Sequence, residues 1–191
     1  MPKFFVNGNE CTVDEPEKLI YYLRDTLKLT SVKDGCTEGA CGTCMVLVDG
    51  KPQKACVLRT DRLEGKHILT VEGLSERERE VYAYAFMHAG AVQCGFCTPG
   101  MVISAKALLD NNLSPTREDV KAAIKNNICR CTGYKKIEDA VLLAAELLKS
   151  SKPVEKHKFT GLLGESMHRV DAKAKTLGTA VYADDIYMEN M

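Results

Sequence analysis

Eight of the nine cysteines in this 191-residue chain fall into two groups of four, and they are the residues best suited to chemistry. In a reducing compartment cysteines rarely pair as disulfides, and clustered thiols more often bind metal or carry out redox reactions. The first group is Cys36, Cys41, Cys44 and Cys56, and the second is Cys94, Cys97, Cys129 and Cys131. Cys11 stands alone in a predicted strand, and we interpret it as a small buried apolar side chain.

The first group has the spacing C-x4-C-x2-C with a distant fourth cysteine, which is typical of a plant-type [2Fe–2S] site. Gly35, Gly39 and Gly42 let the loop close around a cluster and point backbone N–H groups at its sulfurs. Zinc and reduced structural cysteines are the alternatives. Zinc sites usually pair two C-x2-C hooks, and this group has only one.

The second group combines a C-x2-C hook at residues 94–97 with a C-x-C hook at residues 129–131. By spacing alone, four such thiolates suit either zinc or an iron–sulfur cluster. Cys97 and Cys131 each precede a predicted helix, so two helix N-termini would direct partial positive charge and free N–H groups at one site. This favours an anionic cluster, but a zinc tetrathiolate is also anionic and both remain open.

The elements around the first group are predicted to be mainly strands. Asn7-Gly8 is a strong hairpin signal between strands over 3–6 and 10–13. A helix follows over 17–27, and then come strands over 45–48, 53–58 and 67–71. Strands wrapped around one helix favour a β-grasp arrangement.

The second group lies among predicted helices. Ser75 and Glu78 form a capping box for a helix that ends near residue 88. Thr98-Pro99 and Ser114-Pro115 each supply an N-cap followed by proline, and a fourth helix carries an amphipathic face over 137–148. Four short helices indicate a small bundle, so the fold class is α+β. From residue 151 a polar linker begins, and residues 151–191 look like the start of a further domain.

The composition is that of an ordinary globular protein, with 45% hydrophobic and 27% charged residues. A formal net charge of zero gives no reason to expect a nucleic-acid or membrane-surface partner. No apolar run is long enough to span a bilayer, and the first residues lack the apolar core of a secretory signal. We therefore expect a cytoplasmic protein.

Residues 93–100, QCGFCTPG, and residues 129–134, CRCTGY, resemble the signature of the molybdenum hydroxylases, the xanthine dehydrogenase and aldehyde oxidoreductase family. Residues 35–44 resemble the first cluster loop of the same family, and the likeness extends from residue 3 to about 150. It implies two [2Fe–2S] clusters, a plant-type ferredoxin domain over 1–74, and a four-helix-bundle domain over 75–150 with its cluster at two helix N-termini.

The resemblance also implies a role in electron transfer. In that family the bundle cluster lies nearer the molybdopterin cofactor, and by motif position Gln93 and Cys131 would contact the pterin. A neighbouring domain or subunit binds molybdenum and hydroxylates an aldehyde or N-heterocycle. The electrons pass through the bundle cluster and then the ferredoxin-like cluster to a flavin subunit or an external acceptor.

The C-terminal segment strengthens this resemblance. Residues 164–166, 169–172 and 178–186 resemble the first residues of the molybdenum-binding part. No flavin-type segment precedes them, an arrangement similar to the aldehyde oxidoreductases, which favours an aldehyde as substrate. Residues 151–191 would then be a linker and the start of a molybdopterin-binding region.

Two other functions share some of these features. A freestanding two-cluster carrier would have the same ligands but would need no fixed partner, and a zinc-stabilised interaction module would be colourless. Nothing in the sequence resembles a nucleophile–base pair, a phosphate-binding loop or a nucleotide-binding fold. We therefore assign no catalytic residue and do not expect this chain alone to turn over an organic substrate.

Overall fold

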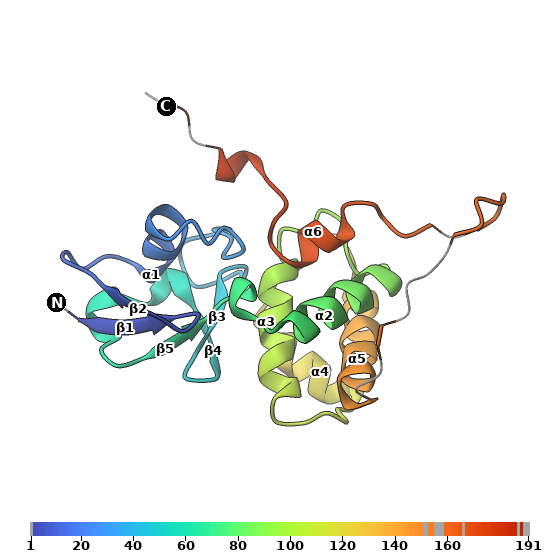
Figure 1. Ribbon diagram of the computed structural model, residues 1–191, viewed down its shortest axis with the longest axis horizontal. Coiled ribbons are helices and arrows are strands. Elements are labelled where there is room, and N and C mark those ends of the chain that lie inside the picture. Colours follow the sequence, from blue (N-terminus) through green and yellow to red (C-terminus); the bar gives the residue numbers. More distant parts are fainter. Residues whose placement is uncertain (1, 151–152, 155–158, 166, 187, 189–191) are drawn as a thin grey trace.

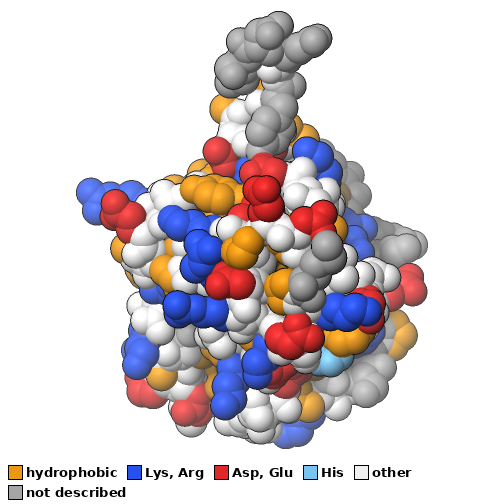
Figure 2. Space-filling view, turned by 90° about the vertical axis from the view of Figure 1, so that its left-hand side faces the viewer, with side chains coloured by type: hydrophobic (Ala, Val, Ile, Leu, Met, Phe, Trp, Pro, Cys, Tyr) orange, Lys and Arg blue, Asp and Glu red, His pale blue; other side chains and the backbone are white. Residues whose placement is uncertain are grey.

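The computed structural model of the chain describes residues 2–150, 153–154, 159–165, 167–186 and 188. A small sheet lobe lies beside a lobe of helices, and the C-terminal segment passes over both (Figure 1). The α+β class predicted from the sequence is confirmed. Basic and acidic side chains are interspersed over the face of the sheet lobe (Figure 2), in line with the zero net charge. Across the described residues, none of the helices combines the length and apolar character needed to cross a bilayer.

Five strands form one sheet in the order β2-β1-β5-β3-β4. They are β1 (Lys3–Val6), β2 (Asn9–Thr12), β3 (Met45–Val48), β4 (Lys51–Lys54) and β5 (His67–Leu69). The predicted hairpin turn is confirmed, because Asn7 and Gly8 take positive φ angles of 51° and 86° between the antiparallel strands β1 and β2. β5 lies parallel to β1 and antiparallel to β3, so it joins the two hairpins into one sheet.

The strand β3 is buried along its whole length because both faces of the sheet are covered. Val46 and Val48 belong to the core of the sheet lobe, whereas Met45 and Leu47 belong to the core of the helical lobe. Side chains alternate between the two faces of a strand, so β3 contributes to both cores at once. This contact fixes the position of the loop that precedes β3, which carries the first cysteine group.

Three predictions for the sheet lobe need correction. The helix expected over 17–27 is α1 (Leu19–Tyr21) followed by one π-helical turn, Tyr22–Thr26. The strand expected over 53–58 is Lys51–Lys54 instead, since the chain enters a 3-10 turn at Ala55 even though the Ala55 N–H still donates to the Cys44 carbonyl at 3.0 Å. The strand expected over 67–71 ends at Leu69. A short 3-10 helix, Ala55–Val57, then turns the Cys56 sulfur toward the first cysteine loop.

The helical lobe contains the four helices predicted for it. They are α2 (Glu76–His88), α3 (Thr98–Leu109), α4 (Arg117–Ile124) and α5 (Lys135–Ser150). The capping box of Ser75 and Glu78 is confirmed. The third helix begins later than predicted, because Thr116 and Asp119 form a capping box of their own in place of a Ser114 cap.

Two helix starts near the cysteines also differ from the prediction. Cys97, not Thr98, is the N-cap of α3, since its carbonyl accepts the N–H of Met101 at 3.0 Å. α5 does not begin directly after Cys131, because Gly133 and Tyr134 have positive φ angles that end any helical turn there. Only α3, therefore, begins immediately after a cysteine of the second group.

A short helix, α6 (Ala172–Thr176), returns the C-terminal segment to the helical lobe. Ala172 and Leu177 are buried in the core of that lobe. The predicted end of the last helix is confirmed, as α5 stops at Ser150. Part of the predicted linker, residues 151–152 and 155–158, lies outside the described residues, as does residue 166 of the predicted molybdenum-binding start.

Candidate metal centres

The first group of cysteines lies in the loop before β3 and in the 3-10 turn after β4. Cys44 and Cys56 are 2% and 1% exposed, whereas Cys36 and Cys41 are half-buried. Backbone N–H groups point at the sulfurs as the sequence predicts. Gly39 donates to Cys56 Sγ at 3.2 Å, and Cys41 donates to Cys36 Sγ at 3.4 Å. The loop is thus already arranged to stabilise thiolates.

The surroundings shift the pKa values of the thiols in this group in different directions. The backbone N–H groups of Cys41 and Glu38 lower the pKa of Cys36 to about 7. Burial raises the pKa of Cys44 to about 12, even though the backbone N–H of Cys56 acts in the opposite direction. A buried thiol of this kind ionises when a metal cation compensates its charge, because a coordinating thiol is deprotonated outright. The buried pair therefore suits a metal better than a free thiolate.

The second group joins the hook before α3 to the hook before α5. The sulfurs of Cys94 and Cys131 lie 3.6 Å apart, and those of Cys97 and Cys129 lie within hydrogen-bonding reach. Two thiolates on one tetrahedral metal with bonds of about 2.3 Å lie about 3.8 Å apart, whereas a disulfide bond is about 2.05 Å long. The spacing of Cys94 and Cys131 therefore fits two ligands of one metal atom.

The pKa values of the thiols in the second group also depend on burial. Burial opposes ionisation of Cys129, but the Thr132 hydroxyl and the backbone N–H groups of Cys131 and Thr132 lower its pKa overall. Burial raises the pKa of Cys97 strongly. The side chain of Cys94 raises the pKa of the exposed Cys131. The second group therefore also consists of a more buried pair, Cys97 and Cys129, and an exposed pair, Cys94 and Cys131.

Each group therefore contains two pairs of thiols. A [2Fe–2S] cluster needs this pattern, since each of its two irons takes two thiolates. Among the described residues, no three histidine, cysteine, aspartate or glutamate side chains converge on a position for one metal ion. A two-iron cluster distributes its ligands over two centres, so its thiolates need not converge on one point.

A direct contact links the two groups. The N–H of Ile128, next to Cys129, donates to the carbonyl of Cys41 at 2.7 Å. Asn127 is 1% exposed, and its side chain donates to the Gly42 carbonyl at 2.9 Å and accepts from Ser104 at 2.7 Å. The hydrogen bond from Ile128 therefore connects the backbone beside Cys129 in one group to that of Cys41 in the other. Sequence reasoning missed Asn127, because nothing in the local pattern shows that it meets a loop 85 residues away.

The sequence-predicted pterin contacts, Gln93 and Cys131, are both exposed on the second group. Cys94 is exposed beside them, so one edge of this group is open to a partner. Cys11 is buried as predicted, and its sulfur lies 3.6 Å from the carbonyl of Asn9.

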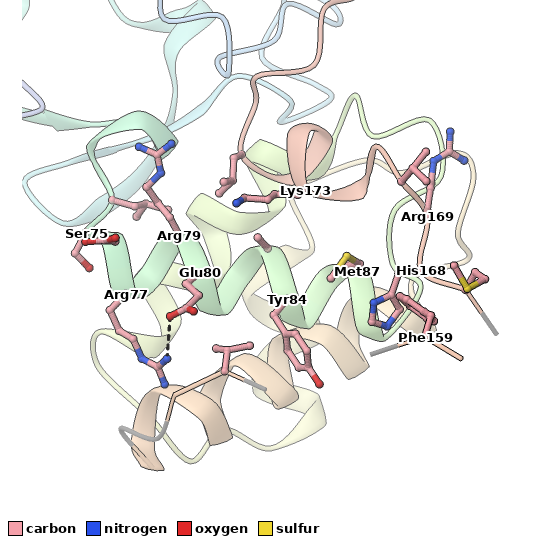
Figure 3. A pocket seen from close by; sticks show the side chains of 17 residues that line it. Ser75, Arg77, Arg79, Glu80, Tyr84, Met87, Phe159, His168, Arg169 and Lys173 are labelled. Carbon is pink, nitrogen blue, oxygen red and sulfur yellow. Dashed lines mark hydrogen bonds and ion pairs between the residues drawn. The ribbon is translucent and has the colours of Figure 1, made fainter. Parts of the chain in front are cut away.

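A cavity of about 1380 Å³ lies away from both cysteine groups (Figure 3). It separates α2 from the C-terminal segment, with Tyr84 and Met87 on one side and Phe159 and His168 on the other. None of the eight grouped cysteines lines it. The cavity therefore plays no part in the chemistry of the cysteines.

Comparisons with known proteins give one matching domain for each of the two cysteine groups. Residues 4–70 match a family model described as a 2Fe-2S iron-sulfur cluster binding domain, and residues 70–142 match a [2Fe-2S] binding domain. The chain is 48% identical over 136 residues to the nicotinate dehydrogenase small FeS subunit of Eubacterium barkeri, a match that covers 70% of this chain and 87% of the relative. The chain belongs to the iron–sulfur proteins of the molybdenum hydroxylase family. It is an electron-transfer component of this oxidoreductase family with two [2Fe–2S] binding domains.

Solved structures of family members agree with this family assignment. An aldehyde oxidoreductase from Desulfovibrio desulfuricans is 42% identical with a TM-score of 0.87, and the match covers 96% of this chain but 22% of that one. Quinoline 2-oxidoreductase from Pseudomonas putida is 38% identical with a TM-score of 0.71, covering 78% of this chain and 95% of that one. The chain therefore resembles a whole chain in one family member and about a fifth of another.

Proposed function

We propose that Cys36, Cys41, Cys44 and Cys56 bind one [2Fe–2S] cluster and that Cys94, Cys97, Cys129 and Cys131 bind a second. The observation that carries this proposal is the arrangement of each group as two thiol pairs, with the two groups joined by one hydrogen bond. The first cluster belongs to a β-grasp domain of plant ferredoxin type over 1–74, and the second to a four-helix bundle over 75–150. The strand order and the four helices support these assignments.

Metal analysis and EPR of anaerobically purified protein test this proposal. We expect about four irons per chain, no stoichiometric zinc, and two distinct signals after reduction. Cys11→Ser is the matched control, because Cys11 is buried outside both groups, and it should keep all four irons. A colourless protein with zinc would support a structural zinc module and overturn the assignment.

The electrons pass between the clusters through the contact of Ile128 with Cys41. The covalent chain from Cys129 to Ile128 and the 2.7 Å hydrogen bond to the Cys41 carbonyl make a short connection between ligands. Asn127→Ala removes the buried side chain that holds the Gly42 carbonyl beside it, leaving polar groups unsatisfied at a cost of about 1–3 kcal/mol. We expect slower transfer between the clusters by pulsed reduction, whereas Asn126→Ala, at an exposed side chain, should leave the rate unchanged.

The exposed edge of the second cluster faces a molybdopterin-binding domain or subunit, and Gln93 and Cys131 contact the pterin. Their exposure beside Cys94 supports this placement. Electrons enter here and leave from the first cluster to a flavin subunit or another acceptor. The match to an aldehyde oxidoreductase extends over 96% of this chain, including residues of the C-terminal segment, and supports an aldehyde as the partner's substrate. None of the nine cysteines is paired in a disulfide bond, which supports a cytosolic location.

Gln93→Ala tests the partner-facing edge. We expect slower reduction of the second cluster by a molybdopterin protein with its substrate, with iron content and both EPR signals retained. Gln53→Ala, on β4, is the control for the loss of a glutamine side chain. If Gln93→Ala and the unaltered chain accept electrons equally fast, the freestanding carrier becomes the better description.

A further inference from the structure

The C-terminal segment over residues 172–186 touches both lobes. Ala172 and Leu177 are 1% and 6% exposed in the core of the helical lobe. Gly178 then passes so close to the sheet lobe that a Cβ would lie 2.2 Å from the Cβ of Ser31, and its φ angle is +73°. Only glycine fits there without a shift of the backbone. The segment is therefore built against both lobes and is not a loose tail.

A buried group of charges fixes its far end. Asp185 has a side chain that is 4% exposed, and it accepts from Lys33 Nζ at 2.6 Å and from Arg24 Nη2 at 2.9 Å. The side chains of Lys33 and Arg24 are 0% and 5% exposed. Two cations held away from water need an anion beside them. Asp185 meets both cations, and the exposed Asp184 carboxylate also pairs with Arg24 Nη2 at 3.0 Å. The segment is therefore bound to the sheet lobe by a buried ion-pair group that is costly to break.

Between these ends, the segment contacts the hook of the second cysteine group. The Tyr182 hydroxyl donates to the carbonyl of Cys94 at 2.8 Å, and its ring packs edge-on against Phe96 with centroids 5.3 Å apart. The Lys33 ammonium lies 4.7 Å from the centre of the same ring. Lys175 packs on Gly95, where an added Cβ would lie 2.7 Å from its Cβ. The backbone of the hook is therefore covered by the segment.

We propose that residues 172–186 form a strap that holds the second cluster's 93–97 hook in register with the sheet lobe, with Asp185 as the lock and Tyr182 as a positioning residue for the cluster. The proposal rests on the function proposed above in placing a cluster at this hook. Hydrogen bonds around ligand sulfurs and access of water set the properties of such clusters. A strap that fixes the hook therefore acts on the second cluster and leaves the first unchanged.

Asp185→Asn in the full chain tests the lock. The variant leaves two buried cations without their shared anion, so the strap should open more often. We expect tryptic cleavage after Lys175, followed by mass spectrometry, to accelerate by at least about tenfold, since cleavage tracks the open population. Asp184→Asn is the matched control. It removes the exposed ion pair of the Asp184 carboxylate with Arg24, but it keeps the backbone bond to Arg24 and the whole Asp185 pair, so it should change the rate less than about twofold.

Tyr182→Phe tests positioning without disturbing the charges. The ring contact with Phe96 is kept and only the hydroxyl bond to the Cys94 carbonyl is lost. We expect the EPR signal and midpoint potential of the second cluster to shift in both Tyr182→Phe and Asp185→Asn, with the first cluster unchanged. Unaltered second-cluster signals in both variants, or wild-type cleavage in Asp185→Asn, would overturn the strap. Fewer than about four irons in the unmutated protein would instead overturn the proposed clusters, while the cleavage result would still report on the strap.

Discussion

The two cysteine sites differ in how far apart in the chain their cysteines lie. The first takes three of its four cysteines from a nine-residue loop, Cys36 to Cys44, and only Cys56 comes from beyond β3. The second takes two from the hook before α3 and two from a hook 32 residues later. The first site is therefore built mostly from local structure, whereas the second exists only when α3, α4 and the turn before α5 have packed.

The two sites also differ in how exposed their cysteines are. The first site has two fully buried cysteines, and the second has two exposed ones. The second site also depends on neighbours from both directions, with Asn127 holding it to the first cysteine loop and the strap covering its hook. The second site is thus open at one edge and firmly held at the others, which suits the exchange of electrons proposed above, with a partner on one side and the first site on the other.

Replacement of one buried ligand in each site gives the largest expected effect. Cys44→Ser and Cys97→Ser should each lose the two irons of its own site and retain about two of four, because serine is a poor ligand for these irons. We expect the Cys97 variant to lose more thermal stability, since its cluster joins two distant hooks. Iron analysis and thermal unfolding under anaerobic conditions measure both quantities. Loss of all four irons from either variant would show that the sites are not independent.

Gly42 lies where the two sites meet and gives the next largest effect. Its φ angle is +72°, and an added Cβ would lie 2.1 Å from the backbone oxygen of Asn126. Gly42→Ala must therefore push the second site away from the first, and we expect a loss of roughly 3–5 kcal/mol in the free energy of unfolding. Gly50→Ala is the matched control, with a φ angle of +76° and nothing within 4 Å, and it should cost about 1–2 kcal/mol.

Denaturant unfolding of the two glycine variants, compared at equal iron loading, measures this difference. Equal losses would mean that the junction adjusts freely and that the sites are not held in register. Slower transfer between the clusters in Gly42→Ala, with normal transfer in Gly50→Ala, would tie the lost stability to the junction itself.

Local signals explain which parts of this molecule could be predicted. The Asn7-Gly8 hairpin, the Ser75 and Glu78 capping box and the end of α5 depend on neighbouring residues, and each was predicted from them. The end of β4 at Lys54 is set by the 3-10 turn over Ala55–Val57, whose apolar residues are indistinguishable from a strand by propensity. Likewise, Ser114 was predicted as the cap because a proline follows it, but the capping box forms between Thr116 and Asp119.

The same reasoning applies to the sites. Cysteine spacing predicted two groups, because ligands of a cluster must lie close together. Asn127 and Asp185 were missed because their partners lie 85 and 152 residues away, and a lone asparagine or aspartate carries no local signature of burial. Long-range polar contacts of this kind become visible only when the packed chain brings both partners together.

The smallest predicted effect compares one hydroxyl in each site. Thr43 Oγ1 lies 3.2 Å from Cys41 Sγ, and Thr132 Oγ1 lies 3.1 Å from Cys129 Sγ. Thr43 already donates its single proton to the carbonyl of Lys33 at 2.9 Å, whereas Thr132 accepts from the N–H of Tyr134 and keeps its proton for the sulfur. The two contacts look alike in length, but only that of Thr132 can fully stabilise a thiolate.

Replacement of Thr132 and of Thr43 by valine should therefore change the midpoint potentials of the two clusters by different amounts. Thr132→Val removes a donor to an anionic ligand, so the midpoint potential of the second cluster should fall by roughly 40 mV, the equivalent of about 1 kcal/mol for one electron. Thr43→Val should lower the potential of the first cluster by less, because its proton is directed at Lys33. Redox titration followed by EPR resolves the two clusters in one experiment. A larger shift in Thr43→Val would show that the Thr43 proton turns to the sulfur once the iron is bound, which would make the two sites alike in this respect.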